Sequence, residues 1–342
     1  MRSYFSTMAG VAAIAVCLPT AALHAQDAAE YYKGKQLQLY VGVSPGGIYS
    51  TFALILSHHF GKYIPGHPSV VVQHMQGAGG TKMLNYVYNV APQDGSVVTA
   101  PNAGVALRVL LKIGKPKYDP AKFQWLGGWG DAINTITLRK DAPAHTLKDA
   151  MKTQIVLGSI GKSSNTFMIP SLMNNTIGTK FKLITGYRGG SPIRAAIERG
   201  EVHGWAGQWL GWKLAKPDWV RDGKLVHLVQ MARKRAADLP NVPLLSEFAT
   251  NDEQREFFGI VQSGIADRAF VAAPKVPRSL TGALAQAYMK TIGDPAFIAE
   301  TGKRSYVIEP IEGSEIQAFV EKMMTMPDAK VERLRTLMGL KN

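Results

Sequence analysis

Apolar and polar segments follow the same order more than once over the first third of the chain. Each time, a short apolar run is followed by a glycine turn and then by apolar residues at helical spacing. The first copy joins a run over 37–43, the turn Ser44-Pro45-Gly46-Gly47 and a helix from about Tyr49. The second joins a run over 69–74, the turn at 76–80 and a helix that contains Met83. Repeated strand–turn–helix units predict a parallel sheet.

A third strand is predicted over 96–100, and it ends in the loop 101–104. Because the carboxyl ends of parallel strands lie at one edge of a sheet, we expect the three loops to meet there. A glycine turn at a helix start also presents unpaired backbone N–H groups, which suits a carboxylate. The alternative is that Pro45-Gly46-Gly47 only turns the chain.

A second α/β run follows a linker at 139–143, with polar glycine loops at 159–165 and 186–192. Helices are expected at 166–175 and from Pro192, and the apolar segment 258–266 is interpreted as a strand that returns to the first domain. We therefore predict a two-domain α/β protein. The first domain comprises 26–138 and 265–342, and the second comprises 139–264. The remaining predicted strands are 123–130, 135–138, 154–158, 181–185, 202–206 and 225–231, and the remaining helices are 147–151, 279–292, 295–301, 314–324 and 329–337.

The first 25 residues differ from the rest and predict a cleavable signal peptide. Arg2 is followed by an apolar run over 8–19 and a cleavage site after Ala25. Export to the periplasm is expected. Cys17, the single cysteine of the sequence, lies in this segment, so the mature chain has no thiol for a disulfide or a metal site.

Positive charge is in excess: the net charge is +14, and removal of Arg2 with residues 1–25 leaves +13. The basic residues are scattered, apart from Arg233-Lys234-Arg235, so they predict a field that attracts anions and not a nucleic-acid site. The histidines show no metal-ligand spacing. We expect no catalytic residues, no metal and no cofactor.

An ordered set of short motifs over almost the whole mature chain resembles the Bug-type extracytoplasmic solute receptors, the substrate-binding proteins of tripartite tricarboxylate transporters. Each motif is weak alone, but their order is specific. The motifs are Ser44-Pro45-Gly46-Gly47, Pro65-Gly66 with Val70-Val71-Val72, Gly77-Ala78-Gly79-Gly80, Ala91-Pro92-Gln93-Asp94-Gly95, Gly186-Tyr187-Arg188-Gly189-Gly190, Gly200-Glu201-Val202-His203-Gly204, Leu239-Pro240-Asn241-Val242-Pro243, Ala273-Pro274 and Gly293-Asp294-Pro295-Ala296-Phe297.

The resemblance implies a type II periplasmic-binding-protein fold, in which two domains close on a carboxylated solute. It implies that Gly46-Gly47 and Ser163-Ser164 line one shared pocket. Carried onto this chain, the first-domain contacts are Pro45, Gly46, Gly47, Ile48, Tyr49, Ser50, Asn102 and Ala103, and the second-domain contacts are Gly161, Ser163, Ser164, Asn165, Tyr187, Arg188 and Gly189.

One departure concerns the ligand. Many relatives carry an aspartate where this chain has Ser50, and its loss removes a partner for a ligand ammonium or hydroxyl group. The pocket becomes more favourable to anions, and an amino-acid ligand is disfavoured.

Several candidate residues also have structural interpretations. Arg188 suits a bidentate grip on a second carboxylate, but a surface arginine beside a turn is equally consistent. Ser163, Ser164 and Asn165 suit both helix capping and ligand binding. Trp205 and Gln208 are candidates for an aromatic wall, whereas burial in a core is the more frequent use of tryptophan.

We therefore expect a monomeric periplasmic protein that captures a small organic acid and delivers it to a membrane permease. The first alternative is a receptor of the same fold that signals to a sensor kinase. The second is an exported enzyme on the same scaffold.

Overall fold

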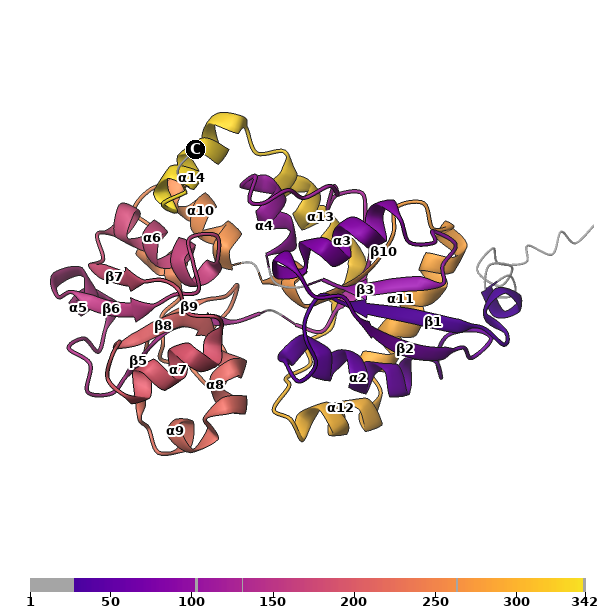
Figure 1. The fold of residues 1–342 in the computed structure, drawn as a ribbon, viewed down its shortest axis with the longest axis horizontal. Coiled ribbons are helices and arrows are strands. Elements are labelled where there is room, and N and C mark those ends of the chain that lie inside the picture. Colours follow the sequence, from indigo (N-terminus) through magenta and orange to yellow (C-terminus); the bar gives the residue numbers. More distant parts are fainter. Residues whose placement is uncertain (1–27, 102–103, 131, 263, 341–342) are drawn as a thin grey trace, which may run out of the picture.

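Two lobes, each built on its own β-sheet, make up the molecule (Figure 1). The computed structural model describes residues 28–101, 104–130, 132–262 and 264–340. The predicted signal peptide lies outside these residues, as do Asn102 and Ala103. The two lobes confirm the predicted α/β architecture.

A six-stranded sheet forms the first lobe. Its first strands are parallel, and β10 runs antiparallel between β3 and β4. In β1, Leu37, Leu39 and Val41 are buried and alternate with less buried residues, because successive side chains of a strand point to opposite faces. The strand order is β11 (Ile311–Glu312), β4 (Gln124–Gly128), β10 (Ala269–Ala272), β3 (Val97–Ala100), β1 (Gln36–Val41) and β2 (Ser69–His74).

Helices cover this sheet and bury their apolar sides against it. In α2, Phe52, Leu56 and Phe60 are spaced by four residues and are fully buried, and Phe52 stacks on Trp129 with ring centroids 3.8 Å apart. The helices of the first lobe are α2 (Ile48–Phe60), α3 (Thr81–Asn89), α4 (Val105–Leu110), α11 (Arg278–Ile292), α12 (Pro295–Gly302) and α13 (Gly313–Met324), with short 3₁₀ helices at Ala78–Gly80 and Ile265–Arg268.

A five-stranded mixed sheet forms the second lobe, in the order β7 (Phe181–Ile184), β6 (Ile155–Gly158), β8 (Gly204–Gln208), β5 (Asn134–Arg139) and β9 (Leu225–Met231). Gly204 allows β8 to approach β5, because a Cβ at this position would lie 2.1 Å from the carbonyl oxygen of Thr137. The helices of this lobe are α5 (Leu147–Lys152), α6 (Asn165–Ile177), α7 (Gly190–Glu198), α8 (Trp209–Ala215), α9 (Pro217–Arg221) and α10 (Asp252–Gln262), with a 3₁₀ helix at Leu245–Phe248.

The last helix, α14 (Asp328–Leu337), crosses back to the second lobe (Figure 1). Leu334 and Leu337 belong to the hydrophobic core of that lobe, and Asn175 on α6 donates a hydrogen bond to the carbonyl oxygen of Leu337 at 2.8 Å. The assignment of all of 265–342 to the first domain is therefore wrong for this helix.

Two further expectations need correction. The predicted strand at 135–138, which we assigned to the first domain, pairs with β8 and β9 in the second sheet. The segment 258–266 is not a strand: most of it belongs to α10, where Phe257, Phe258 and Val261 are buried at helical spacing. The strand that returns to the first lobe is β10.

Candidate functional site

Two adjoining hollows between the lobes are the candidates for the site. The first, which we call the α2–α7 hollow, is bounded by the start of α2 in the first lobe and the start of α7 in the second, and its volume is about 510 Å³. This volume is in the range of known ligand pockets. Its lining residues are Gly46, Gly47, Ile48, Gly190, Ser191, Arg194, Trp205, Gln208, Gly211, Leu214 and Ala215.

Both helices direct their N-termini at this hollow. The N-cap residues, Gly47 for α2 and Gly189 for α7, make no side-chain capping hydrogen bond, and neither helix has an acidic residue in its first turn. The first N–H groups of a helix lack partners within the helix, and the helix dipole is positive at that end. Two such ends on one hollow favour an anion between the lobes.

Arg194, in the middle of α7, adds a positive charge to the same wall. Its Nη2 donates to Ser191 at 3.0 Å, and its guanidinium lies 5.9 Å from the centre of the Trp205 ring. Burial lowers the pKa of this guanidinium, while nearby Glu198 opposes the shift. An anion beside Arg194 would offset the cost of that burial.

Glycines determine where Trp205 lies. A Cβ on Gly190 would lie 2.7 Å from the indole, and one on Gly207 would lie 2.4 Å from it. The ring therefore packs between the start of α7 and the end of β8, where it is 7% exposed. This packing confirms the structural role of Trp205, and the residue also lines the hollow.

The second hollow, the α4–α6 hollow, has a volume of about 240 Å³. Three of its lining residues carry a buried polar atom with no hydrogen-bond partner in the described structure: Arg108 Nε, Trp205 Nε1 and Gln208 Oε1. Such atoms are rare in folded proteins because each costs free energy. The lining residues are Gly104, Leu107, Arg108, Asn134, Ile160, Ser163, Ser164, Asn165, Thr166, Met168, Trp205, Ala206, Gly207 and Gln208.

The two hollows adjoin at Trp205 and Gln208, which line both. Gln208 Nε2 also donates to the Tyr49 hydroxyl at 3.2 Å, from the second lobe to the first. Gly46-Gly47 and Ser163-Ser164 therefore line neighbouring hollows, and the expectation of one shared pocket is wrong for this arrangement of the lobes.

The structure brings eight predicted site residues to these hollows. They are Gly46, Gly47, Ile48, Ser163, Ser164, Asn165, Trp205 and Gln208. Tyr49 reaches them through its bond to Gln208.

The other predicted contacts that the structure describes line neither hollow. Ser50 is fully buried and its hydroxyl lies 2.9 Å from His74 Nε2, so it faces the interior of the first lobe. Arg188 is exposed to solvent, and Tyr187 packs against the core beside Ile193. Pro45, Gly161 and Gly189 are likewise absent from both linings, although Gly189 caps α7.

Sequence reasoning missed the two arginines of the hollows, Arg108 and Arg194. Each lies about one turn inside a helix that follows a glycine loop. That position could have identified them as site residues, because such a side chain can reach back towards the loop.

The described residues bring together no group of three or more His, Cys, Asp or Glu side chains that could hold a metal ion. Within the same ranges, no helix is both long enough and apolar enough to cross a membrane.

Two solved structures have a fold similar to that of this chain. A TctC solute-binding protein from Polaromonas has a TM-score of 0.67 and 17% identity, and the match covers 90% of this chain and 99% of that one. The R. palustris protein Rpa4515 with adipate has a TM-score of 0.66 and 19% identity, over 90% of this chain and 98% of that one. The fold is therefore that of the type II periplasmic binding proteins.

The sequence identifies the family. A model of the tripartite tricarboxylate transporter family receptor, TctC, matches residues 64–329. The "UPF0065 protein in gbd 5'region" of Cupriavidus necator is 27% identical over 296 residues, which is 84% of each chain. The chain belongs to the tripartite tricarboxylate transporter receptor family, which confirms the resemblance of its motifs.

Proposed function

We propose that this protein is a periplasmic receptor that captures a small carboxylate between its lobes and delivers it to the membrane subunits of a tripartite transporter. The observation that carries the proposal is the α2–α7 hollow, where two helix N-termini and Arg194 surround one space. The family is a receptor family, and a protein of the same fold is described with adipate.

The carboxylate lies, in this proposal, between Gly46-Gly47 and Arg194. Backbone N–H groups at the start of α2 hold one side of the anion, and the guanidinium holds the other. Because the two partners belong to different lobes, the anion binds best when the lobes are close together. Binding then shifts the population towards the closed form.

The α4–α6 hollow receives the far end of the ligand. Arg108 Nε and Trp205 Nε1 are donors without partners, and Gln208 Oε1 is an acceptor without one. A ligand with an acceptor and a donor at its far end would satisfy all three. Protein atoms cover these groups in the present arrangement, so the lobes or side chains must adjust when the ligand enters.

Gly47→Val tests the anion site. A Cβ on Gly47 meets nothing within 4 Å, and the backbone φ of −90° suits any residue, so the substitution leaves the fold intact. Its branched side chain occupies the space above the first N–H groups of α2. We expect carboxylates that raise the melting temperature of the wild-type protein to have no effect on the variant.

Gly282→Val is the matched control, because it also adds valine in open space on an exposed helix, α11. It should keep the full ligand response in a thermal-shift screen of di-, tri- and aromatic carboxylates. Equal responses from the two variants would refute the placement. Loss of carboxylate uptake in cells without this chain would support the transport role, and unchanged uptake would contradict it.

A further inference from the structure

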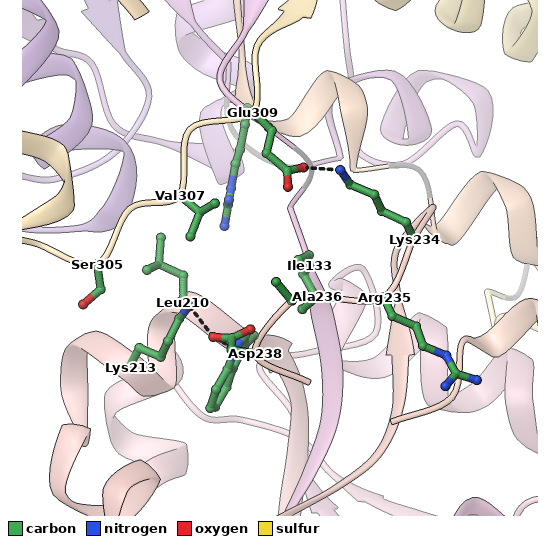
Figure 2. A pocket seen from close by; sticks show the side chains of 14 residues that line it. Ile133, Leu210, Lys213, Lys234, Arg235, Ala236, Asp238, Ser305, Val307 and Glu309 are labelled. Atoms are coloured by element: carbon green, nitrogen blue, oxygen red, sulfur yellow. Dashed lines mark hydrogen bonds and ion pairs between the residues drawn. The ribbon is translucent and has the colours of Figure 1, made fainter. Parts of the chain in front are cut away.

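A third cavity, the hinge cavity, lies between the lobes and shares no lining residue with the two hollows. Figure 2 shows it from close by. Its volume is about 180 Å³. The lining residues come from the connection between β4 and β5, from α8, from the segment after β9, from the 3₁₀ helix before β10 and from the segment before β11: Gly130, Ile133, Trp209, Leu210, Lys213, Lys234, Arg235, Ala236, Ala237, Asp238, Arg268, Ser305, Val307 and Glu309.

One wall of the hinge cavity is apolar. The side chains of Ile133, Leu210 and Val307 converge there, with Ala236 beside them (Figure 2). Val307 is 59% exposed, which leaves apolar surface for a ligand to cover. An apolar cavity of about 150 Å³ holds benzene, so this space suits a group of the size of one ring.

Positive charge predominates at the rim. Four cationic side chains line the cavity against two anionic ones, Asp238 and Glu309. Asp238 is already engaged, since Lys213 Nζ at 2.8 Å and Trp209 Nε1 at 2.9 Å both donate to it.

Lys234 is the cation that can change partner. It lies 3.1 Å from Glu309 across the two lobes, and both side chains are largely exposed (Figure 2). An ion pair of this kind contributes little free energy, so a ligand carboxylate can replace Glu309 as the partner of Lys234.

We propose that the hinge cavity is a second small-molecule site, which binds a compact apolar group that carries one carboxylate. The ring or branched chain packs on Ile133, Leu210 and Val307, and the carboxylate pairs with Lys234. The proposal of this site does not depend on the carboxylate proposed for the α2–α7 hollow.

Helix α8 separates the hinge cavity from the α2–α7 hollow. Trp209, Leu210 and Lys213 line the cavity, whereas Gly211 and Leu214 line the hollow. An occupant of the cavity also touches both lobes and takes Lys234 away from Glu309. If the hollow binds as proposed above, each ligand changes the affinity for the other by the same factor.

Methyl NMR of the Gly47→Val protein tests the site without interference from the α2–α7 hollow, with benzoate as the probe. We expect the methyl signals of Ile133, Leu210 and Val307 to shift with benzoate concentration and to reach saturation. Val307→Trp, which fills the cavity, should abolish the shifts of Ile133 and Leu210. Val90→Trp adds the same side chain at a 70% exposed site just after α3 and should retain them.

A second variant tests the charge without filling the cavity. Lys234→Gln should raise the benzoate dissociation constant about two- to fivefold and leave the binding of toluene, a neutral probe, unchanged. The proposal is overturned if the three methyl signals of the Gly47→Val protein do not respond, if those of Ile133 and Leu210 respond equally in Val307→Trp, or if Lys234→Gln affects both probes alike. Shifts confined to Ile48 and Leu214 would place benzoate in the α2–α7 hollow and also overturn it.

Discussion

Gln208 and Tyr49 join the two lobes by a hydrogen bond across the space where a ligand is expected. The amide Nε2 of Gln208, the last residue of β8, donates to the hydroxyl of Tyr49 on the first turn of α2 at 3.2 Å. Gln208 lines both hollows, so this bond lies at their common wall. The contact stabilises the present arrangement of the lobes.

Tyr49→Phe should weaken ligand binding without unfolding the protein. The ring that contacts Trp129 is kept, and only the hydroxyl bonded to Gln208 is lost. A neutral hydrogen bond contributes about 0.5–1.5 kcal/mol, so we expect affinity to fall about two- to tenfold. Calorimetric titration measures this change, and X-ray scattering should show a more open ligand-free protein.

Tyr63→Phe is the control for that substitution. Its hydroxyl donates to Asp294 at 2.9 Å within the first lobe, so the variant loses a hydrogen bond without a change between the lobes. An affinity loss as large as that of Tyr49→Phe would show that the bond between the lobes has no special role.

Arg194→Gln should weaken carboxylate binding much more than Arg188→Gln. Arg194 lines the α2–α7 hollow, whereas Arg188 is exposed outside it. A hydrogen bond to a charged group contributes about 1.5–3 kcal/mol, so the first substitution should reduce affinity by about 10- to 150-fold. Titration of both variants with the same carboxylate decides this, and a larger effect at Arg188 would favour a different site.

Arg108→Gln should reduce affinity for ligands that reach the α4–α6 hollow while leaving the ligand-free protein no less stable. The Nε atom of Arg108 is buried without a partner, so its removal costs the free protein no hydrogen bond. Chemical denaturation and titration measure the two effects. Lys112→Gln, whose amine pairs with Asp328 outside the hollow, is the control. Equal affinity of Arg108→Gln and wild type would count against a ligand in the α4–α6 hollow.

Stability should fall as pH decreases from about 6.5 towards 4, because of His227. Burial lowers the pKa of this imidazole to about 4, and Asp238 only partly opposes the shift. The unfolded chain therefore binds a proton in this window that the folded protein does not. The full contribution of neutral His227 to the free energy of unfolding is present above the pKa of the unfolded state. About 2–3 kcal/mol of it is lost as the pH falls to the pKa of the folded state.

His227→Gln tests that assignment by urea unfolding at pH 7.5 and pH 5. The variant should be less stable at pH 7.5, because the His227 ring packs on Trp209 and lies 2.9 Å from the Thr137 hydroxyl. It should nevertheless lose less stability at pH 5 than the wild type. His145→Gln, at an exposed position, should retain the wild-type dependence, and an unchanged pH slope in His227→Gln would contradict the assignment.

Local patterns predicted most of the secondary structure. The glycine turn before α2 and the spacing of Phe52, Leu56 and Phe60 locate that helix to within one residue. The failure at 258–266 has a physical cause, since a short unbroken apolar run fits a buried strand and a buried helix equally well. Only packing against β9 and Leu245 distinguishes the two.

The sequence predicted the loops of the site better than it predicted the charged residues of the site. Glycine loops indicate where backbone N–H groups will be exposed, and Gly46-Gly47 indeed line a hollow. Whether an arginine in or near such a loop faces the ligand depends on helix rotation and on the angle between the lobes. Neither follows from local pattern, which is why the sequence indicates Arg188 and does not indicate Arg194.

Because α14 packs on the second lobe, the core of that lobe is completed late in synthesis. Strands β5 to β9 leave the ribosome well before α14, yet their hydrophobic core includes Leu334, Leu337 and Met338. The core of that lobe therefore stays incomplete until α14 has been synthesised. Until then, the apolar side chains that α14 covers remain without their packing partners.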